Sequence, residues 1–467
     1  MTRISNHKFL IAIATLLIIS SSCKKSYIEL LPPTSLTPDQ ALATEADVQV
    51  ALRGAYAGFR ATDYFGRTVP LLGDLMADNT YQSLTNTNRY TAFNLYNFTS
   101  ADGNVAGFWT AAYNTILRAN NIISASPKVT NQANLNQYKG EAYAIRALSY
   151  YYLIQYFARP YTDNPSGPGV PLVLTYDPTA KPARNTVAEV YTQILNDLTQ
   201  ATPLMTQFVN SSQFSKYAAR ALQAKVYLAM GDKANAKTAA IDVITNSGFT
   251  VVSAANYVTF WSTLTPRTDK VETLFETSSD AINNQGFDAL ANIYNQAGYG
   301  DFLATDTLYN SYSAGDARRG IYTVGVRGGL AAIFLDKKFP GTYGSEISDP
   351  KLIRMSEMYL IAAEASLPGN EADALTYVNY LTSRRNAPAI ASTGAQLFED
   401  IIAERRRELA FDGIRYFDLQ RLKRDVIRNS QYPASARTIP YSNFRRVLPI
   451  PQGELDANPN ITQNPGY

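Results

Sequence analysis

Two stretches of the chain carry the residue spacing of a helical hairpin, and this spacing constrains the fold more than any other feature. In residues 216–244, Ala224, Tyr227 and Ala236 follow one another at intervals of three and nine residues around a Gly-Asp turn. Small side chains at such positions let two helices approach closely, as in tetratricopeptide (TPR) repeats. The C-terminal half repeats the layout around a Pro-Gly turn, with Ile361, Ala362, Ala374, Val378 and Leu381. The spacing predicts TPR-like helical hairpins.

Helical patterns also cover much of the remaining chain. Thr186 and Glu189 form a capping box, in which the side chain of each residue satisfies a backbone amide of the other. An apolar stripe at helical spacing follows the box, as expected for a helix that packs on a core. We therefore expect a mainly α protein in which TPR-like helices form a right-handed helical scaffold. The helices are expected at about 38–62, 107–247 and 352–425.

Two segments interrupt the helical pattern. Residues 63–106 and 248–350 are rich in Gly, Asn and Tyr and keep no lasting period. The second segment contains an apolar run at 273–276 that is typical of a short strand. Because variable loops on a rigid scaffold are a common place for a binding site, we expect two irregular, ligand-facing inserts that carry short strands.

Aromatic and polar side chains in the inserts are the candidate ligand-binding residues. Tyrosine rings in polar loops can stack on the apolar faces of sugar rings, while Asn and Asp side chains bond to sugar hydroxyls. The candidates are Tyr81, Tyr90, Tyr96, Tyr294, Tyr299, Asp78 and Asn79. For Asp78 and Asn79, service in a turn or helix cap is the alternative. Trp109 and Trp261 are expected to pack in the core.

The N-terminus has the layout of a secretory signal peptide. A positively charged front precedes an apolar run at 9–19, which is too short to span a bilayer as a helix. Three serines then lead to Cys23, the only cysteine in the chain. We expect residues 1–22 to be removed and Cys23 to become the lipidated N-terminus. The remaining residues, 23–467, are expected to form a single domain.

The scarcity of histidine limits the chemistry that the chain can perform. The only histidine, His7, lies in the expected signal peptide, so the mature chain cannot use a histidine-dependent triad or a histidine-ligated zinc. Removal of residues 1–22, with two basic residues, leaves 40 basic and 39 acidic residues, which gives no general attraction to nucleic acid. We predict no catalytic residue, metal or cofactor. Two carboxylates need no histidine, so a secreted glycoside hydrolase stays open as an alternative.

The most distinctive motif lies in residues 397–422, where apolar positions at helical spacing surround ERRRELAFDGIRYFDLQR. The alternating charges of Glu404, Arg405 and Glu408 are typical of a solvated helix face, and we expect them there. Gly413 stands where a helix would end in a left-handed residue.

The same string resembles the signature of the SusD/RagB family of Bacteroidetes outer-membrane lipoproteins. Residues 354–365, RMSEMYLIAAEA, and the C-terminal strings LPIP and QNPGY are similar to the same family. These matches stand in the family's order along the chain. They therefore imply a SusD-like domain over nearly the whole sequence.

The resemblance implies a nutrient-binding lipoprotein rather than an enzyme. Such a protein is anchored in the outer membrane, exposed at the cell surface, and captures an oligosaccharide or peptide. It then delivers the ligand to a SusC-like TonB-dependent transporter. Two other functions stay open: the carboxylate-dependent hydrolase, and a periplasmic TPR-like adaptor that binds peptides.

Overall fold

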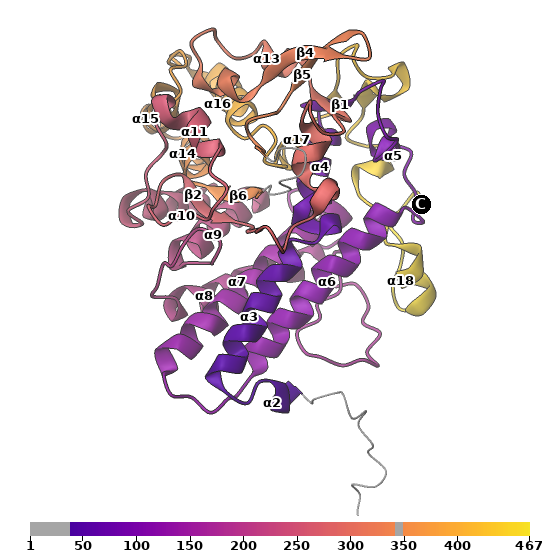
Figure 1. Ribbon diagram of the computed structural model, residues 1–467, viewed down its shortest axis with the longest axis vertical. Coiled ribbons are helices and arrows are strands. Elements are labelled where there is room, and N and C mark those ends of the chain that lie inside the picture. Colours follow the sequence, from indigo (N-terminus) through magenta and orange to yellow (C-terminus); the bar gives the residue numbers. More distant parts are fainter. Residues whose placement is uncertain (1–37, 341–348) are drawn as a thin grey trace, which may run out of the picture.

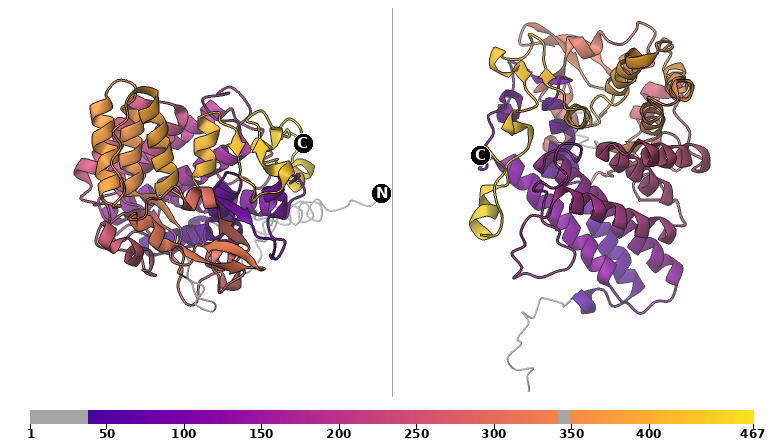
Figure 2. Two further views of the ribbon diagram at one scale, coloured as in Figure 1. Left: turned by 90° about the horizontal axis from the view of Figure 1, so that it is seen from above. Right: turned by 180° about the vertical axis from the view of Figure 1, so that it is seen from behind.

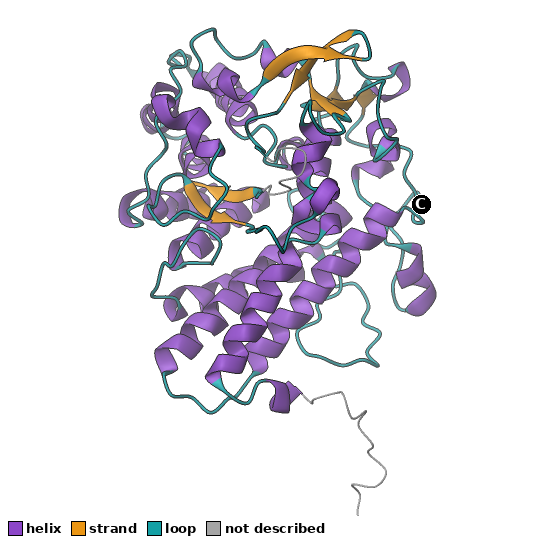
Figure 3. Cartoon of the chain, in the orientation of Figure 1, coloured by secondary structure: helices purple, strands orange, loops and turns teal. Residues whose placement is uncertain are grey.

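The computed structural model describes residues 38–340 and 349–467, and helices dominate these residues (Figures 1 and 3). The expected signal peptide and Cys23 lie outside the described residues. None of the described helices is both long and apolar enough to cross a bilayer. The main helices are α2 (Pro38–Ala41), α3 (Glu45–Phe59), α6 (Gly103–Ser124), α7 (Gln132–Phe157), α8 (Val187–Leu204), α9 (Lys216–Met230), α10 (Lys233–Asn246), α14 (Met355–Ala365), α15 (Glu371–Ser383), α16 (Gly394–Glu408) and α17 (Arg415–Arg421).

Neighbouring helices pack as the predicted hairpins. Ser215 caps α9 by accepting a hydrogen bond from the Ala218 amide, and Gly231 ends this helix at a left-handed φ of 77°. Asp232 then caps α10, so the Gly-Asp turn reverses the chain within two residues. α10 packs against α14, and α14 against α15. Figure 2 shows the helices side by side in a curved array. The mainly α, TPR-like prediction is confirmed.

The described strands form four short antiparallel pairs, and two of these pairs, β1–β3 and β2–β6, connect segments that are far apart in the sequence. Because β1 belongs to the first insert and β3 to the second, their pairing joins the two inserts. The short strand expected at 273–276 is present as β2. The pairs are β1 (Thr80–Gln82) with β3 (Phe302–Ala304), β2 (Thr273–Glu276) with β6 (Lys351–Arg354), β4 (Thr323–Arg327) with β5 (Leu330–Phe334), and β7 (Val426–Ile427) with β8 (Thr438–Ile439).

The inserts also contain short helices, and one of these helices is part of the core. All eight residues of α4 are buried, and Figure 1 places this helix near the middle of the molecule. The first insert is therefore anchored in the interior before its chain reaches the surface. The short helices are α4 (Thr68–Leu75), α5 (Thr91–Leu95), α11 (Tyr257–Trp261), α12 (Leu290–Tyr294), α13 (Asp306–Tyr309) and, near the C-terminus, α18 (Gln452–Ala457).

The charged residues of the motif lie in the interior, and the prediction of a solvated helix face is wrong. Glu404 and Glu408 are each 1% exposed, and Arg405 is 2% exposed. Glu408 accepts hydrogen bonds from Arg385 Nε at 2.8 Å and from Arg354 Nη1 at 2.9 Å. Paired and hydrogen-bonded charges can be buried, whereas an isolated charge would not tolerate this environment. The motif therefore forms the centre of a buried ion-pair network.

Candidate functional site

The two inserts meet at one end of the molecule, next to the β4–β5 hairpin (Figure 1). Arg327, at the end of β4, donates a hydrogen bond from Nε to the carbonyl oxygen of Thr85 at 3.1 Å. It also donates from Nη2 to the carbonyl oxygen of Tyr299. Thr85 belongs to the first insert and Tyr299 to the second. The hairpin is itself part of the second insert, so this one arginine ties it to the Tyr299 segment of the same insert and to the first insert.

A mixed aromatic and charged surface lies at this junction. We call it the ledge, and it consists of Arg89, Asp288 and Tyr299, which contact one another through Arg89, and of Phe287, which precedes Asp288 in the chain. The guanidinium carbon of Arg89 lies 4.1 Å from the centroid of the Tyr299 ring. Arg89 Nη2 lies 3.6 Å from Asp288 Oδ1, and Arg67 Nη1 holds the same oxygen at 2.6 Å. Phe287 is 46% exposed. The ledge offers apolar ring surface beside groups that can bond to hydroxyls.

Three of the predicted tyrosines do not reach the surface. Tyr90 and Tyr96 are each 4% exposed, and Tyr294 is 1% exposed. Arg67 Nε donates to the Tyr90 hydroxyl at 2.8 Å, and the Tyr96 hydroxyl donates to a backbone carbonyl. Tyr294 stacks on Phe339 with centroids 5.8 Å apart. The predicted open platform does not hold for these rings, because the inserts fold over them.

Tyr81 and Tyr299 are the predicted tyrosines that stay partly exposed. Tyr81 lies opposite Leu303 in the β1–β3 pair and packs against a small apolar cluster that includes Phe334. Sequence reasoning missed Phe287, although it lies in the same polar, Gly-containing surroundings that pointed to the tyrosines. Nothing near Arg89 in the sequence indicates that it belongs to this surface, because its partner Tyr299 is 210 residues away.

Asp78 and Asn79 hold the first insert against the motif. Arg415 Nε donates to Asp78 Oδ1 at 2.8 Å, and Arg406 Nε donates to Asn79 Oδ1 at 2.9 Å. Burial alone would raise the pKa of Asp78, but attraction to Arg415 and Arg406 outweighs it and lowers the pKa to about 2. The two residues are 8% and 0% exposed. The structure therefore gives both residues a structural role, away from any open ligand surface.

Comparison with known proteins places this architecture in a family. Residues 27–228 match a family model described as starch-binding and associating with the outer membrane, and residues 327–467 match the model of the SusD family. A SusD superfamily protein from Bacteroides thetaiotaomicron, known from its crystal structure, is 30% identical in sequence to this chain. The alignment covers 91% of this chain and 100% of that one, with a TM-score of 0.83. This chain belongs to the SusD/RagB family.

Other SusD/RagB relatives agree. A SusD superfamily protein from Bacteroides vulgatus is 28% identical over 91% of this chain and 99% of its own, with a TM-score of 0.85. SusD-like protein P2 from Formosa agariphila is 29% identical, and the alignment covers 98% of this chain and 100% of the relative. The resemblance inferred from the motifs is confirmed. The family description supports carbohydrate binding and association with the outer membrane.

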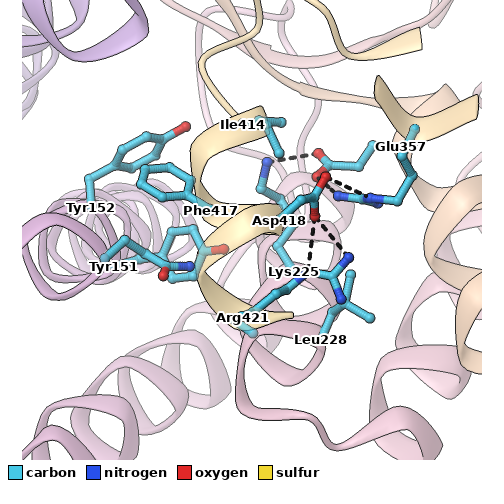
Figure 4. A pocket seen from close by; sticks show the side chains of 12 residues that line it. Tyr151, Tyr152, Lys225, Leu228, Glu357, Ile414, Phe417, Asp418 and Arg421 are labelled. Carbon is cyan, nitrogen blue, oxygen red and sulfur yellow. Dashed lines mark hydrogen bonds and ion pairs between the residues drawn. The ribbon is translucent and has the colours of Figure 1, made fainter. Parts of the chain in front are cut away.

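One cavity in the SusD/RagB scaffold is too small for a sugar (Figure 4). Its volume is about 20 Å³, room for about one water molecule. The charged side chains around it pair with one another: Lys225 Nζ lies 2.7 Å from Glu357 Oε2, and Arg405 Nε lies 3.1 Å from Asp418 Oδ2. The cavity belongs to the buried ion-pair network and is not a ligand site.

Two carboxylic acids with a raised pKa are too enclosed to act on a substrate from solvent. Burial raises the pKa of Glu141 to about 7 and that of Asp74 to about 6, values suited to a general acid. Both side chains are enclosed, however, with exposed fractions of 3% and 0%. Within residues 38–340 and 349–467, no group of three or more His, Cys, Asp or Glu is arranged to hold a metal ion.

Proposed function

We propose that this protein captures an oligosaccharide at the ledge and passes it to a SusC-like TonB-dependent transporter. The observation that carries the proposal is the contact of Arg89 with Tyr299. It joins the two inserts, and places an aromatic ring beside a guanidinium group and, through Asp288, a carboxylate. Such a mixture fits the apolar faces and the hydroxyls of a sugar. Family membership supports the class of ligand.

Attachment to the membrane is the second part of the proposal. Lipidation of Cys23 anchors the mature chain, because several acyl chains together bury enough hydrocarbon for stable attachment. Residues 24–37 then connect the anchor to α2. We place the protein on the outer face of the outer membrane, where it meets polysaccharide from the surroundings.

Delivery requires a surface on which the transporter docks, and the β4–β5 hairpin supplies one. Val324 and Val326 are 62% and 63% exposed. Their partners across the hairpin are Ile333 and Ala331, so one face of the hairpin carries four apolar side chains. Contiguous exposed apolar side chains mark interaction surfaces. Because Arg327 ties this hairpin to the ledge, a transporter docked there would lie over the ligand.

Calorimetry tests the capture step. The mature chain carrying Cys23→Ser is titrated with plant and host oligosaccharides, and each mixture is then analysed for cleavage. We expect binding without cleavage, weakened at least about tenfold by Tyr299→Ala or Phe287→Ala, since each removes an aromatic contact. Ile282→Ala is the control, because Ile282 is 91% exposed in the same insert but outside the ledge. Cleaved sugars would instead favour the hydrolase.

A further inference from the structure

A second hollow lies away from the inserts, between α6 and the loop that joins α7 to α8. Figure 1 shows this loop, residues 158–186, curving beside α6 in the lower part of the molecule. The hollow has a volume of about 700 Å³ and is lined by α6, residues 171–182 of the loop, and residues in and after α18. This volume is within the usual range for small-ligand sites. We call it the α6 groove.

We propose that the α6 groove is a second carbohydrate-binding site, which holds another part of the same glycan chain as the ledge. The inference rests on the proposed function, since it takes the ligand to be a glycan. It goes further by assigning a separate site to residues outside both inserts.

The loop forms a wall of the groove because its two ends are fixed. The Tyr113 hydroxyl donates to the carbonyl oxygen of Pro171 at 2.8 Å. At the other end, Asn458 Nδ2 donates to the carbonyl oxygen of Pro182 at 2.9 Å. Between these anchors, Asp177 accepts hydrogen bonds from within the loop. The ends of the loop are thus held in place, and residues 174–180 between them are exposed.

Flat apolar surfaces face the groove from both sides. On α6, Trp109 lines the groove but is only 4% exposed, as expected for a core residue. Its ring centroid lies 4.8 Å from that of Tyr113, which is half-buried. Trp109 Nε1 donates to Glu454 Oε2 at 3.2 Å, which fixes the plane of the indole. Tyr176 projects from the loop and is 57% exposed. The exposed ring of Tyr176 and the half-buried ring of Tyr113 are suited to packing against the apolar face of a sugar, and Trp109 supports Tyr113 from the interior.

The polar lining favours a glycan over a peptide. The exposed polar side chains are mostly neutral hydroxyls and amides, which match sugar hydroxyls as both donors and acceptors: Thr110, Asn114, Thr175 and Thr179. A proline-rich peptide would also stack on aromatic rings, but would present fewer hydrogen-bonding groups to this lining.

The groove also continues beyond its own walls. A neighbouring hollow of about 580 Å³ shares Thr110 and Asn114 with it and runs along α6 towards Asp63. A binding surface that extends in this way suits a chain of several sugar units. Two sites that bind one polysaccharide would raise its apparent affinity through effective concentration.

The chain offers an internal reporter for this groove. Trp109 and Trp261 are its only two tryptophans. Trp261 is 2% exposed, and its buried Nε1 has no hydrogen-bond partner. Trp261→Phe therefore removes an N–H group that makes no hydrogen bond and keeps an aromatic ring at this position. We expect the variant to fold. Trp109 is then the only source of tryptophan fluorescence.

The experiment titrates the Trp261→Phe protein with maltoheptaose and with heptasaccharides of β-linked glucose and of xylose. Fluorescence and calorimetry are measured in parallel. We expect the oligosaccharide that binds to shift the Trp109 emission. Adding Tyr176→Ala should weaken that shift about tenfold. Leu174→Ala should leave it unchanged, because Leu174 is 38% exposed in the same loop but does not line the groove. Tyr299→Ala, at the ledge, should leave the size of the shift at saturating sugar unchanged, because the groove binds a sugar without the ledge.

The outcomes separate the two proposals. Calorimetric binding with an unchanged Trp109 emission overturns the second site and leaves capture at the ledge intact. A shift that is lost in Tyr299→Ala but kept in Tyr176→Ala also overturns the second site. Absence of binding by every sugar, in both measurements, counts against both proposals. A proline-rich peptide is titrated last, and a Trp109 shift caused by this peptide alone overturns the carbohydrate site in favour of a peptide site.

Discussion

Gly73 and Gly413 lie backbone to backbone, so that a β-carbon on Gly73 would overlap the carbonyl group of Gly413. Gly413 has the expected left-handed conformation, with a φ of 72°. Its amide donates to Asp74 Oδ2 at 2.9 Å. The Asp-Gly turn of the motif thus packs directly against α4. The close contact joins the first insert to the ion-pair network.

We expect Gly73→Ala to lower the free energy of unfolding by about 2–3 kcal/mol, because the added methyl group forces the two backbones apart. Urea unfolding measures the change. Gly54→Ala is the control, since a β-carbon there meets nothing within 4 Å, and alanine favours the helix by about 0.5–1 kcal/mol. Equal stability of the two variants would contradict the close contact.

The buried carboxylate of Glu408 gives a second prediction. It accepts hydrogen bonds from Arg385, Arg354 and Arg318. Glu408→Gln removes the negative charge that neutralises these buried guanidinium groups. We therefore expect the free energy of unfolding to fall by about 3–5 kcal/mol. Glu399→Gln is the matched control. Its pair with Arg424 is exposed, and removing it should cost less than about 1 kcal/mol. Similar losses in the two variants would show that burial of the network adds little.

Stability should also depend on pH through Glu141. Burial raises its pKa from 4.5 to about 7 in the folded protein, although Tyr56 and Gln137 donate hydrogen bonds to it. The folded state therefore binds the proton more tightly, and this contribution to stability is lost as pH rises from about 4.5 to 7.

We expect Glu141→Gln to reduce the fall in unfolding free energy between pH 4.5 and pH 7.5 by on the order of 2 kcal/mol. Urea unfolding at the two pH values measures it. Glu189→Gln serves as the control, because hydrogen bonds lower the pKa of Glu189 at an exposed helix cap. An unchanged pH dependence in Glu141→Gln would show that Glu141 ionises normally in the folded protein.

The helical scaffold could be predicted from sequence because its signals are local. The spacing of Ala224, Tyr227 and Ala236 and the Gly-Asp turn lie within one hairpin, and they hold in the structure. The burial of Glu408 could not be predicted in this way. Its arginine partners stand 23, 54 and 90 residues away, so nothing beside it in the sequence indicates that its charge is neutralised.

The candidate site was only partly predictable for the same reason. Composition located both inserts, and Tyr299 does lie at their junction. Whether a loop tyrosine is open or covered depends on a distant segment, as Tyr294 shows where it is covered by Phe339 and Phe411. Both tyrosines lie in polar sequence and were therefore predicted to be exposed. Of the two, only Tyr299 is partly exposed in the structure.

Membrane attachment can be tested at Cys23. We expect Cys23→Ser to abolish acylation, so that the protein moves from the outer-membrane fraction to the soluble fraction. Metabolic labelling with a fatty acid and fractionation of cells measure the two effects. Protease treatment of intact cells producing the unaltered protein then reports the face of the membrane. Retention of Cys23→Ser in washed membranes would mean that another contact holds the protein there.

The hairpin face gives the last prediction, which concerns the transporter. Val326→Asp places a charge in the centre of the exposed apolar face, so docking would have to remove water from a carboxylate as well as lose an apolar contact. We expect the amount of transporter recovered with the protein from detergent-solubilised outer membranes to fall at least about tenfold. Glycan binding should stay unchanged, because Val326 is not part of the ledge.

Val50→Asp is the matched control, since Val50 is 64% exposed against 63% for Val326 and lies on α3, away from the hairpin. If Val50→Asp lost the transporter and Val326→Asp kept it, the docking surface would be helical and the hairpin would be free of the complex.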